Sequence, residues 1–258
     1  MVKLMTKINQ ILTEWIPGDV HSLKWFRERG VEQNMAYEYF QGGALEKLGP
    51  GVYSRKKEKP KWQGGIRLLQ EEFEKLIHVS GKTALELQGH AHYISMRDKP
   101  TILLTAYSKV KIPKWFTSIN FECEFKLNNS TLFTEKIELT KHQVDGFQIL
   151  VSSRELAILE FLSTLELSNS FETAENYMNA LQTLRPNVVQ TLLEKCTSVK
   201  VKRVFLYLSE KLELPYFKKL DLTKIDLGIG KRQVIKENGQ LNQKYQITVP
   251  RKYEENPF

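Results

Sequence analysis

The stretch from His21 to Lys57 constrains the fold of this chain more than any other part of the sequence. Its first part, HSLKWFRERG, alternates charged residues with Leu23, Trp25 and Phe26, and it ends at Gly30. Its second part, VEQNMAYEYFQGG, again has apolar residues at helical spacing and ends at two glycines. The pattern predicts two short amphipathic helices around a tight glycine turn, which is the outline of a helix-turn-helix.

The residues that follow the second helix predict a β-hairpin. The run ALEKLGPGVYSRKK has two short strand-like segments around a Gly-Pro-Gly turn and ends in cations. Upstream, residues 3–15 have the apolar spacing of a further helix, which a Pro-Gly pair ends. A hairpin placed directly after the last helix is a wing, so we expect residues 1–60 to form a winged helix-turn-helix domain.

The exposed side of the last predicted helix carries side chains suited to a DNA duplex. Asn and Gln can pair with adenine edges in the major groove, and cations on the wing suit phosphates. Glu38 shares that side and is unfavourable beside DNA, although it could accept a hydrogen bond from cytosine. Polar helix faces also occur in winged domains that bind proteins, so this alternative stays open. The expected DNA-binding residues are Gln33, Asn34, Tyr37, Gln41, Lys47, Arg55, Lys56 and Lys57.

The charge of the chain is unevenly distributed. The 258 residues carry a net charge of +8, of which residues 1–60 contribute +3 and residues 198–258 contribute +6. The middle, residues 61–197, has a net charge of −1. Cations at an end that also has a helix-turn-helix pattern favour a polyanionic partner. A modest positive balance is common among bacterial proteins, so charge alone does not decide the question.

Hydropathy and cysteine usage predict a cytoplasmic protein that does not enter a membrane. No apolar run approaches the roughly 20 residues needed to cross a bilayer. Residues 1–19 lack the apolar core and the small-residue cleavage site of a signal peptide. Cys123 and Cys196 lie far apart and outside any Cys-x-x-Cys motif, so we expect both thiols to be reduced.

The rest of the chain, residues 61–258, predicts a larger mixed α/β domain after a charged, proline-containing linker at residues 56–62. Its first part, residues 61–150, has an α+β pattern. The expected elements are helices at residues 66–76 and 82–89, strands at 77–81, 101–105 and 119–127, and a loop at 112–116 that anchors an aromatic pair. The fold class is therefore α+β.

The second part, residues 151–258, predicts a mainly helical region that ends in a hairpin. Four helical patterns follow one another from Ser152 to residue 212, with Ser152 and Ser170 as candidate N-caps for the first two. The tail from residue 231 to residue 250 returns to strand patterns about an Asn238-Gly239 turn.

One short motif is compatible with a metal-dependent nuclease. Glu122, Glu124 and Lys126 alternate along a predicted strand, and Asp98 could supply a second acidic ligand upstream. Strand alternation would place the three on one face, as metal-assisted phosphodiester chemistry requires. Alternating charged and apolar residues are equally typical of a half-exposed strand, and Asp98 lies in a loop. The motif is weak, and the nuclease remains an alternative.

The other motifs do not indicate an enzyme. His78, His90 and His92 could hold a metal, but no Cys or carboxylate stands at ligand spacing beside them. The sequence at 81–83, Gly-Lys-Thr, lacks the upstream glycine of a phosphate-binding loop, so it predicts a strand-to-helix turn. We found no other nucleophile, dinucleotide or metal signature. The sequence therefore predicts a protein without catalytic residues, metal or cofactor.

A cluster of cations with interleaved aromatic residues lies near the C-terminus. It is compatible with a second surface for DNA or an RNA-like partner, or with a solvated rim on a helical domain, and the pattern leaves both open. The cations are Lys200, Lys202, Arg203, Lys218, Lys219, Lys231, Arg232 and Lys244.

Long stretches of the chain resemble the AbiEi-like antitoxins of type IV toxin–antitoxin (abortive infection) systems. The similar stretches are RERGVEQNMAYEYFQGGALEKLGPGVYSR, KWQGGIRLLQ, HVSGKTALELQGHAHYIS, IPKWF, VSSRELAILEFL, LRPNVVQTLLEKCTSVKVKRVFLYLSEKL and DLGIGKRQVIKENGQLNQKYQITVPRKYE. Two departures concern the last helix of the helix-turn-helix. It opens with Glu32-Gln33-Asn34 where the family usually has small hydroxyl residues, and Glu38 stands where a cation is frequent.

The resemblance implies two roles. The winged domain would bind repeats in double-stranded DNA at its own promoter and repress the operon. The C-terminal domain would act as an antitoxin against a nucleotidyltransferase-like toxin without forming a stable complex with it. The expected antitoxin surface comprises Lys200, Lys202, Arg203, Lys218, Lys219, Lys231 and Arg232. A ligand-sensing transcriptional regulator without an antitoxin role is a further alternative.

Overall fold

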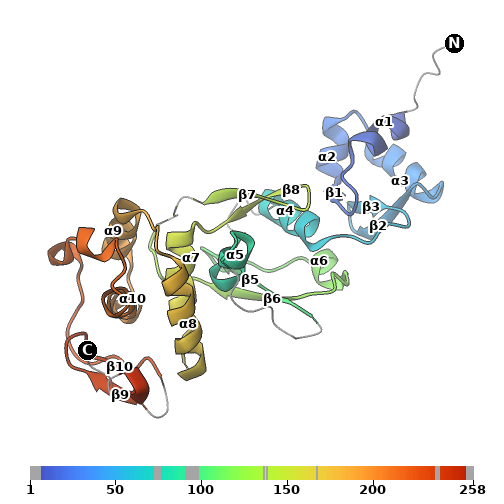
Figure 1. Ribbon diagram of the computed structural model, residues 1–258. Coiled ribbons are helices and arrows are strands. Elements are labelled where there is room, and N and C mark those ends of the chain that lie inside the picture. Colours follow the sequence, from blue (N-terminus) through green and yellow to red (C-terminus); the bar gives the residue numbers. More distant parts are fainter. Residues whose placement is uncertain are drawn as a thin grey trace.

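The computed structural model describes residues 7–72, 77–90, 99–135, 137, 139–166, 168–235 and 239–253. The molecule is elongated, with the N-terminal unit at one end, a five-stranded sheet in the middle, and the last helices and a hairpin at the other end (Figure 1). None of the described helices is long and apolar enough to span a bilayer.

The N-terminal unit is a winged helix, as predicted. Its three helices are α1 (Lys7–Glu14), α2 (Leu23–Glu28) and α3 (Gln33–Gln41), and its wing is the hairpin of β2 (Leu45–Gly49) and β3 (Val52–Arg55). A strand that the sequence pattern did not predict, β1 (Val20–Ser22), pairs antiparallel with β3, so the sheet order is β1-β3-β2. The unit has its own core, formed by Ile11, Trp15, Phe26, Val31, Ala36, Leu45 and Tyr53.

The middle of the molecule is a mixed sheet with helices packed on it. Its strands are β4 (Ile77–Val79), β5 (Thr101–Ala106), β6 (Glu124–Asn129), β7 (Thr140–Val144) and β8 (Phe147–Val151), in the order β6-β5-β4-β8-β7. The pairs β5·β6 and β4·β8 are parallel, and the other two pairs are antiparallel. Helices α4 (Trp62–Glu72), α5 (Gly81–Leu87) and α6 (Lys114–Ser118) connect or flank these strands.

Two local expectations for this part were wrong, and one hairpin was missed. Residues 112–116 are not a loop throughout, because α6 begins at Lys114, although Trp115 and Phe116 do form the expected buried aromatic pair. The strand expected from residue 119 begins only at Glu124, because Glu122 has a positive φ of 59° that is incompatible with a strand. The β7–β8 hairpin was missed, and it turns through Asp145 and Gly146, both with positive φ.

The C-terminal part consists of the four expected helices and a hairpin. The helices are α7 (Arg154–Ser163), α8 (Ser168–Ala180), α9 (Pro186–Lys195) and α10 (Val199–Lys211), followed by short 3-10 turns at Phe217–Lys219, Leu222–Lys224 and Arg251–Tyr253. Strands β9 (Gly239–Asn242) and β10 (Ile247–Pro250) pair antiparallel.

Two N-cap expectations for the C-terminal part were wrong. Ser170 lies inside α8, which begins at Ser168. The N-cap of α7 is Ser153, which accepts from Leu156 N–H, whereas the hydroxyl of Ser152 donates to Glu160. The described hairpin turns between Asn242 and Ile247, and Asn238 of the turn expected at residues 238–239 lies outside the described residues. The turn is favoured because the Asn242 side chain accepts from the Tyr245 N–H at 2.8 Å.

The winged unit is attached to α4 through a buried ion pair between Asp19 and Arg67. The Arg67 guanidinium donates to Asp19 Oδ1 at 3.0 Å and to the Val20 carbonyl at 2.9 Å. The Asp19 side chain is 3% exposed, so the pair is shielded from water. A Cβ on Gly64 of α4 would lie 2.8 Å from Asp19 Oδ1, which shows how closely the helix approaches. The attachment therefore depends on the Arg67 cation of α4 and on Gly64, whose missing side chain allows the close approach.

The same guanidinium sets the protonation state of His21. Arg67 Nη2 lies 3.1 Å from His21 Nδ1, and a guanidinium can only donate, so Nδ1 accepts. The ring proton then resides on Nε2, which lies 3.3 Å from Asp19 Oδ2. Burial, together with the neighbouring cations Arg67 and Arg29, lowers the pKa of His21 to about 2. His21 is therefore neutral in the folded protein.

This neutral histidine predicts acid destabilisation. In the unfolded chain His21 takes up a proton near its ordinary pKa of 6.5, whereas the folded protein excludes that proton down to about pH 2. The unfolded state binds more protons in this window, so stability falls as the pH drops. We expect His21 alone to lower the free energy of unfolding by about 1.4 kcal/mol per pH unit below about pH 6. Urea unfolding between about pH 7.5 and about pH 5 measures the slope.

The matched variants for this experiment are His21→Asn and His142→Asn. The first removes the buried imidazole and should make the pH dependence shallower by the amount given above. The second removes a histidine on the edge strand β7 and should leave the slope close to that of the unchanged protein. An identical slope in the His21→Asn variant would show that His21 is not the group responsible.

Candidate nucleic-acid interface

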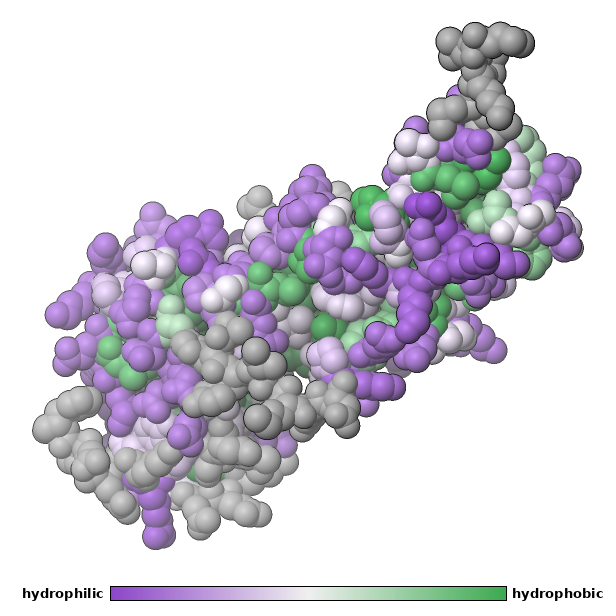
Figure 2. All heavy atoms as spheres, turned by 45° about the vertical axis from the view of Figure 1, so that its right-hand side comes forward, coloured by the Kyte–Doolittle hydropathy of each residue, from purple (hydrophilic) through white to green (hydrophobic). Residues whose placement is uncertain are grey.

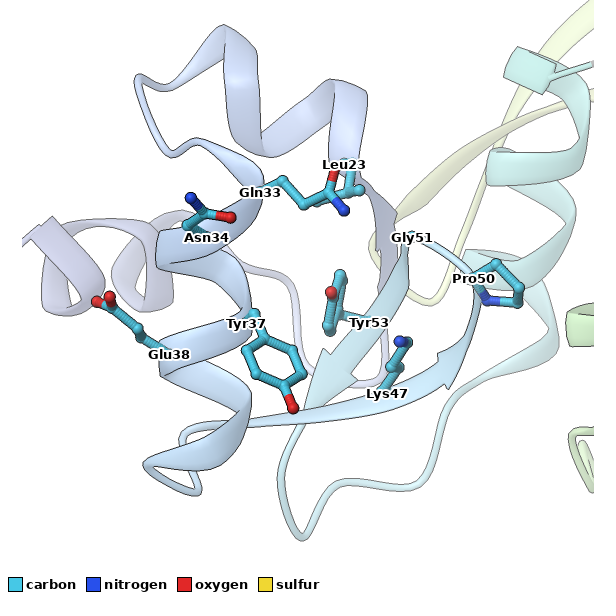
Figure 3. Close-up of a pocket in the computed structure, with 9 residues that line it drawn as sticks. All are labelled: Leu23, Gln33, Asn34, Tyr37, Glu38, Lys47, Pro50, Gly51 and Tyr53. Carbon is cyan, nitrogen blue, oxygen red and sulfur yellow. The ribbon is translucent and has the colours of Figure 1, made fainter.

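Helix α3 and the wing form the two walls of an open groove of about 490 Å³. Figure 3 shows its residues, with Gln33, Asn34 and Tyr37 on the helix side and Lys47 and Tyr53 on the hairpin side. The groove exists because Lys47 and Tyr53 are register partners in the β2–β3 ladder, so their side chains share the face that looks toward α3. The complete lining is Leu23, Gln33, Asn34, Tyr37, Glu38, Lys47, Pro50, Gly51 and Tyr53.

The helix side of the groove presents the polar side chains that the sequence predicted. Gln33, Asn34, Tyr37 and Gln41 are all exposed, and Tyr37 retains 49% of its accessible surface, which is unusual for a large aromatic side chain. Gln41 Nε2 donates to the Tyr37 hydroxyl at 2.8 Å and so continues the polar face by one helical turn. Four of the eight expected residues line the groove, and Gln41 is linked to it through Tyr37.

The cations of the wing do not all behave as expected. Lys47 is exposed at the groove, and Lys56 and Lys57 are exposed where the hairpin ends. Arg55 is instead half-buried: its Nη1 donates to the Trp15 carbonyl at 3.3 Å and its Nε lies 3.1 Å from Glu58. Arg55 therefore connects the wing to the end of α1, and a phosphate contact from it would have to compete with these partners.

Five lining residues were not among the expected DNA-binding residues, namely Leu23, Glu38, Pro50, Gly51 and Tyr53. Tyr53 is 3% exposed and packs edge-to-face on Phe26, so it forms the floor of the groove and belongs to the core beneath it. Burial raises the pKa of Tyr53, and the nearby Tyr37 contributes in the same direction. Glu38 also lines the groove, and its carboxylate points away from the hairpin in Figure 3. Strand register would have identified Tyr53, because Tyr53 is the partner of Lys47.

The expected C-terminal cation surface is wrong for two of its members. Lys202 and Arg203 are 3% and 4% exposed, respectively, because α10 is surrounded on nearly all sides. The Arg203 guanidinium donates to four main-chain carbonyls, those of Leu227, Gly228, Gly230 and Gln246. It holds the loop that contains Gly228 and Gly230, both with positive φ, against β10.

The remaining members of that cluster are distributed as follows. Lys200 is half-buried, and its ammonium donates to the Leu165 carbonyl at 2.9 Å. Arg232 is half-buried, and its Nη1 donates to the carbonyls of Ile229 and Lys231. Lys218, Lys219 and Lys231 are exposed. These three lysines are the part of the expected antitoxin surface that is fully available to a partner.

The residues of the nuclease alternative do not share one strand face. Glu122 precedes β6 and pairs with Lys59 at 2.9 Å, while Glu124 and Lys126 lie on β6. Asp98 falls outside the described residues. Within the described ranges, no group of three or more His, Cys, Asp and Glu residues could hold a metal ion.

The histidine and Gly-Lys-Thr motifs have structural partners. His78 is fully buried and its Nε2 lies 2.8 Å from Glu160, whereas His92 falls outside the described residues. Gly81 begins α5, as the predicted strand-to-helix turn requires, and its N–H donates to Glu160 at 3.0 Å. A carboxylate therefore takes the N–H that a bound phosphate would need.

Comparisons with known proteins identify a family and a fold. A family model described as "Transcriptional regulator, AbiEi antitoxin N-terminal domain" matches residues 5–96, and one described as "Transcriptional regulator, AbiEi antitoxin, Type IV TA system" matches residues 99–250. No curated protein matches the chain. A solved structure, the crystal structure of the RV2827C protein from Mycobacterium tuberculosis, is similar with a TM-score of 0.58 and 10% identity, covering 90% of this chain and 86% of that chain. At this identity the likeness shows the fold alone.

The environment of Arg203 predicts a structural role for this cation. Arg203→Met keeps an unbranched apolar stem but removes the donors to four carbonyls, so we expect it to lower the free energy of unfolding by about 3 kcal/mol. Urea denaturation at neutral pH measures the loss. Lys231→Met changes an exposed cation of the same loop and should shift the free energy of unfolding by no more than about 0.5 kcal/mol. Equal effects of the two changes would contradict the structural role.

Proposed function

Because the chain belongs to the family of AbiEi antitoxin transcriptional regulators of type IV toxin–antitoxin systems, we propose that it binds inverted repeats in its own promoter and represses its operon. The groove between α3 and the wing would be the contact surface for the duplex. Its C-terminal part would counteract a nucleotidyltransferase-like toxin without holding that toxin in a stable complex.

The observation that carries the DNA proposal is the composition of the groove. Its helix side offers exposed amide and phenol groups, which suit base edges and phosphates, and its hairpin side offers the Lys47 ammonium. A helix fits the major groove of B-form DNA, and a wing beside it reaches the adjacent backbone. This arrangement supports the proposal, because a helix in the major groove would bring the polar side chains toward base edges and the Lys47 ammonium toward a phosphate.

The rigid floor of the groove adds to this support. Tyr53 is anchored in the core of the winged unit, and β3 is paired on both sides, with β1 and with β2. A surface built on paired strands and a helix needs little rearrangement on binding, so less conformational entropy is lost. Among the described residues, Glu38 is the one carboxylate that lines the groove, and its orientation away from the hairpin keeps it apart from Lys47.

Replacement of the wing lysines should weaken DNA binding independently of sequence. Lys47→Ala and Lys56→Ala each remove one potential phosphate contact, so each should reduce the slope of log affinity against log salt by about 0.9. Fluorescence anisotropy with the DNA upstream of the gene, over a series of salt concentrations, measures the slope. Lys195→Ala, which removes an exposed lysine of α9 paired with Glu135, is the matched control and should leave the slope unchanged.

A contrasting variant separates positioning from base recognition in the same experiment. Asn34→Ala should leave the salt slope unchanged while reducing the difference in affinity between the promoter repeat and scrambled DNA, by about 1–3 kcal/mol for a lost bidentate contact. Unchanged affinity and slope in both lysine variants would place the duplex elsewhere on the protein.

The antitoxin proposal is tested through the exposed lysines of the C-terminal part. Lys218→Glu combined with Lys219→Glu should abolish protection in cells that also express the neighbouring toxin gene, because the substitutions reverse the charge of an exposed pair. Repression of a promoter reporter should persist in the same variant. The control reverses Lys141 and Lys195, two exposed lysines elsewhere, and should keep both activities. Protection by the Lys218/Lys219 variant would remove these residues from the antitoxin surface.

A further inference from the structure

A second cavity lies in the central part of the molecule, away from the winged unit. It has a volume of about 350 Å³ and opens where the parallel strands β5 and β6 end, next to the end of α7 and the start of α10. Small-molecule sites occupy roughly 300–1,000 Å³, and crevices at the carboxyl ends of parallel strands are frequent ligand positions. The size and the position are therefore those of a small-molecule site.

The strand register places several polar groups on one face of the sheet at this cavity. Thr105 of β5 is the partner of His78 on β4 and of Asn128 on β6, so the three side chains share a face. Ser80, two residues after His78, has the same orientation along the chain. Helix α7 covers that face and contributes Glu160, which lines the cavity. The polar wall is thus fixed by regular secondary structure.

Glu160 is the charged group at the inner end of this wall. It is 7% exposed and accepts from three donors: His78 Nε2 at 2.8 Å, Ser152 Oγ at 2.6 Å and Gly81 N at 3.0 Å. A carboxylate has about four acceptor positions, so one remains. His78 lies outside the cavity lining and holds this carboxylate in place from within the core.

The lining excludes two classes of ligand. The described residues around the cavity include no Lys and no Arg, and their single charge is the Glu160 carboxylate, so a phosphate or another anion would be repelled. An apolar ligand would leave many polar groups without partners. The hydroxyl and amide side chains of the lining include Ser80, Thr105, Asn128, Ser130, Ser163 and Thr164.

The hydrogen bonds already made within the wall determine which of its side chains can still donate to a ligand and which can only accept. Ser163 and Thr164 donate their hydroxyl protons to the carbonyls of Glu160 and Phe161, respectively, so they can only accept from a ligand. Ser130 accepts from the Leu132 N–H at 3.2 Å, so its own proton can still be donated. Asn128 offers both a donor and an acceptor. A ligand that fits must both donate and accept, as vicinal hydroxyl groups do.

We propose that this cavity binds an uncharged, polyhydroxylated small molecule, either a free sugar or the ribose of a nucleoside. The ligand hydroxyls would donate to Glu160, Ser163 and Thr164 and accept from Ser130 and Asn128. The proposal is independent of the promoter and toxin roles, since none of these residues belongs to the winged unit or to the C-terminal lysines.

Calorimetric titration of the full chain with ribose, glucose, adenosine, guanosine, cytidine and uridine tests the proposal. We expect saturable binding of at least one of them at concentrations up to about 10 mM, which corresponds to a weak site. Binding of both free sugars identifies a sugar site, whereas binding of nucleosides alone identifies a nucleoside site with a contribution from the base. Where a nucleoside binds, its 5′-monophosphate should bind more weakly, because the lining, as far as the structure describes it, holds a carboxylate and no cation.

Variants assign the binding to this cavity. Ser130→Ala and Asn128→Ala each remove one group of the wall that would donate to the ligand, and each should weaken the binding about tenfold. Thr117→Val on α6 removes an exposed hydroxyl that donates to the Lys114 carbonyl, and it should leave the affinity unchanged. Circular dichroism and promoter binding check that the variants are folded. No saturable binding of any of the six compounds, or full affinity in both wall variants, would overturn the proposal.

Discussion

The position of the winged unit depends on one buried ion pair, Asp19 with Arg67. Burial raises the pKa of Asp19, and the Arg67 guanidinium opposes that shift because it favours the charged carboxylate. The same cation donates to the Val20 carbonyl and keeps His21 neutral. Because Val20 and Val52 also belong to the apolar core of the central sheet, the sheet that carries the wing has a fixed orientation. Groove and central sheet are therefore parts of one packed structure.

The sequence predicted those features of the fold that depend on local periodicity. The helices of the winged unit, the wing and the four C-terminal helices follow from apolar spacing, and glycine, serine or proline marks several of their ends. The β1 strand was not predictable in this way, because three residues show no alternation and the strand is defined only by its pairing with β3. The β7–β8 hairpin was missed because its turn requires a positive φ at Asp145, which local patterns specify weakly.

The candidate site shows the same division between local and tertiary information. Gln33, Asn34, Tyr37 and Lys47 were found because exposure on a short helix or an edge strand follows from the residue pattern. The prediction of exposed cations was wrong where contacts with residues distant in the sequence determine the orientation of the side chain. Arg55 has the Trp15 carbonyl and the Glu58 carboxylate as partners, and only Glu58 is close to it in the sequence. Arg203 has four carbonyls as partners, all of them distant in the sequence. A count of cations cannot distinguish a guanidinium that stabilises a loop from one that faces solvent.

The groove of the winged unit and the cavity at the ends of β5 and β6 differ in the charge of their lining, so they suit different ligands. The groove of the winged unit combines an exposed ammonium with polar side chains and is open to a polyanion, which gains electrostatic attraction without a large desolvation cost at an exposed site. The cavity at the ends of β5 and β6 has a carboxylate held by three donors, and a phosphate there would lose its hydration without gaining a cation. The groove therefore suits a nucleic acid, and the cavity at β5 and β6 does not. A neutral polyol loses hydrogen bonds to water when it enters this cavity, and the polar side chains of the lining can replace them.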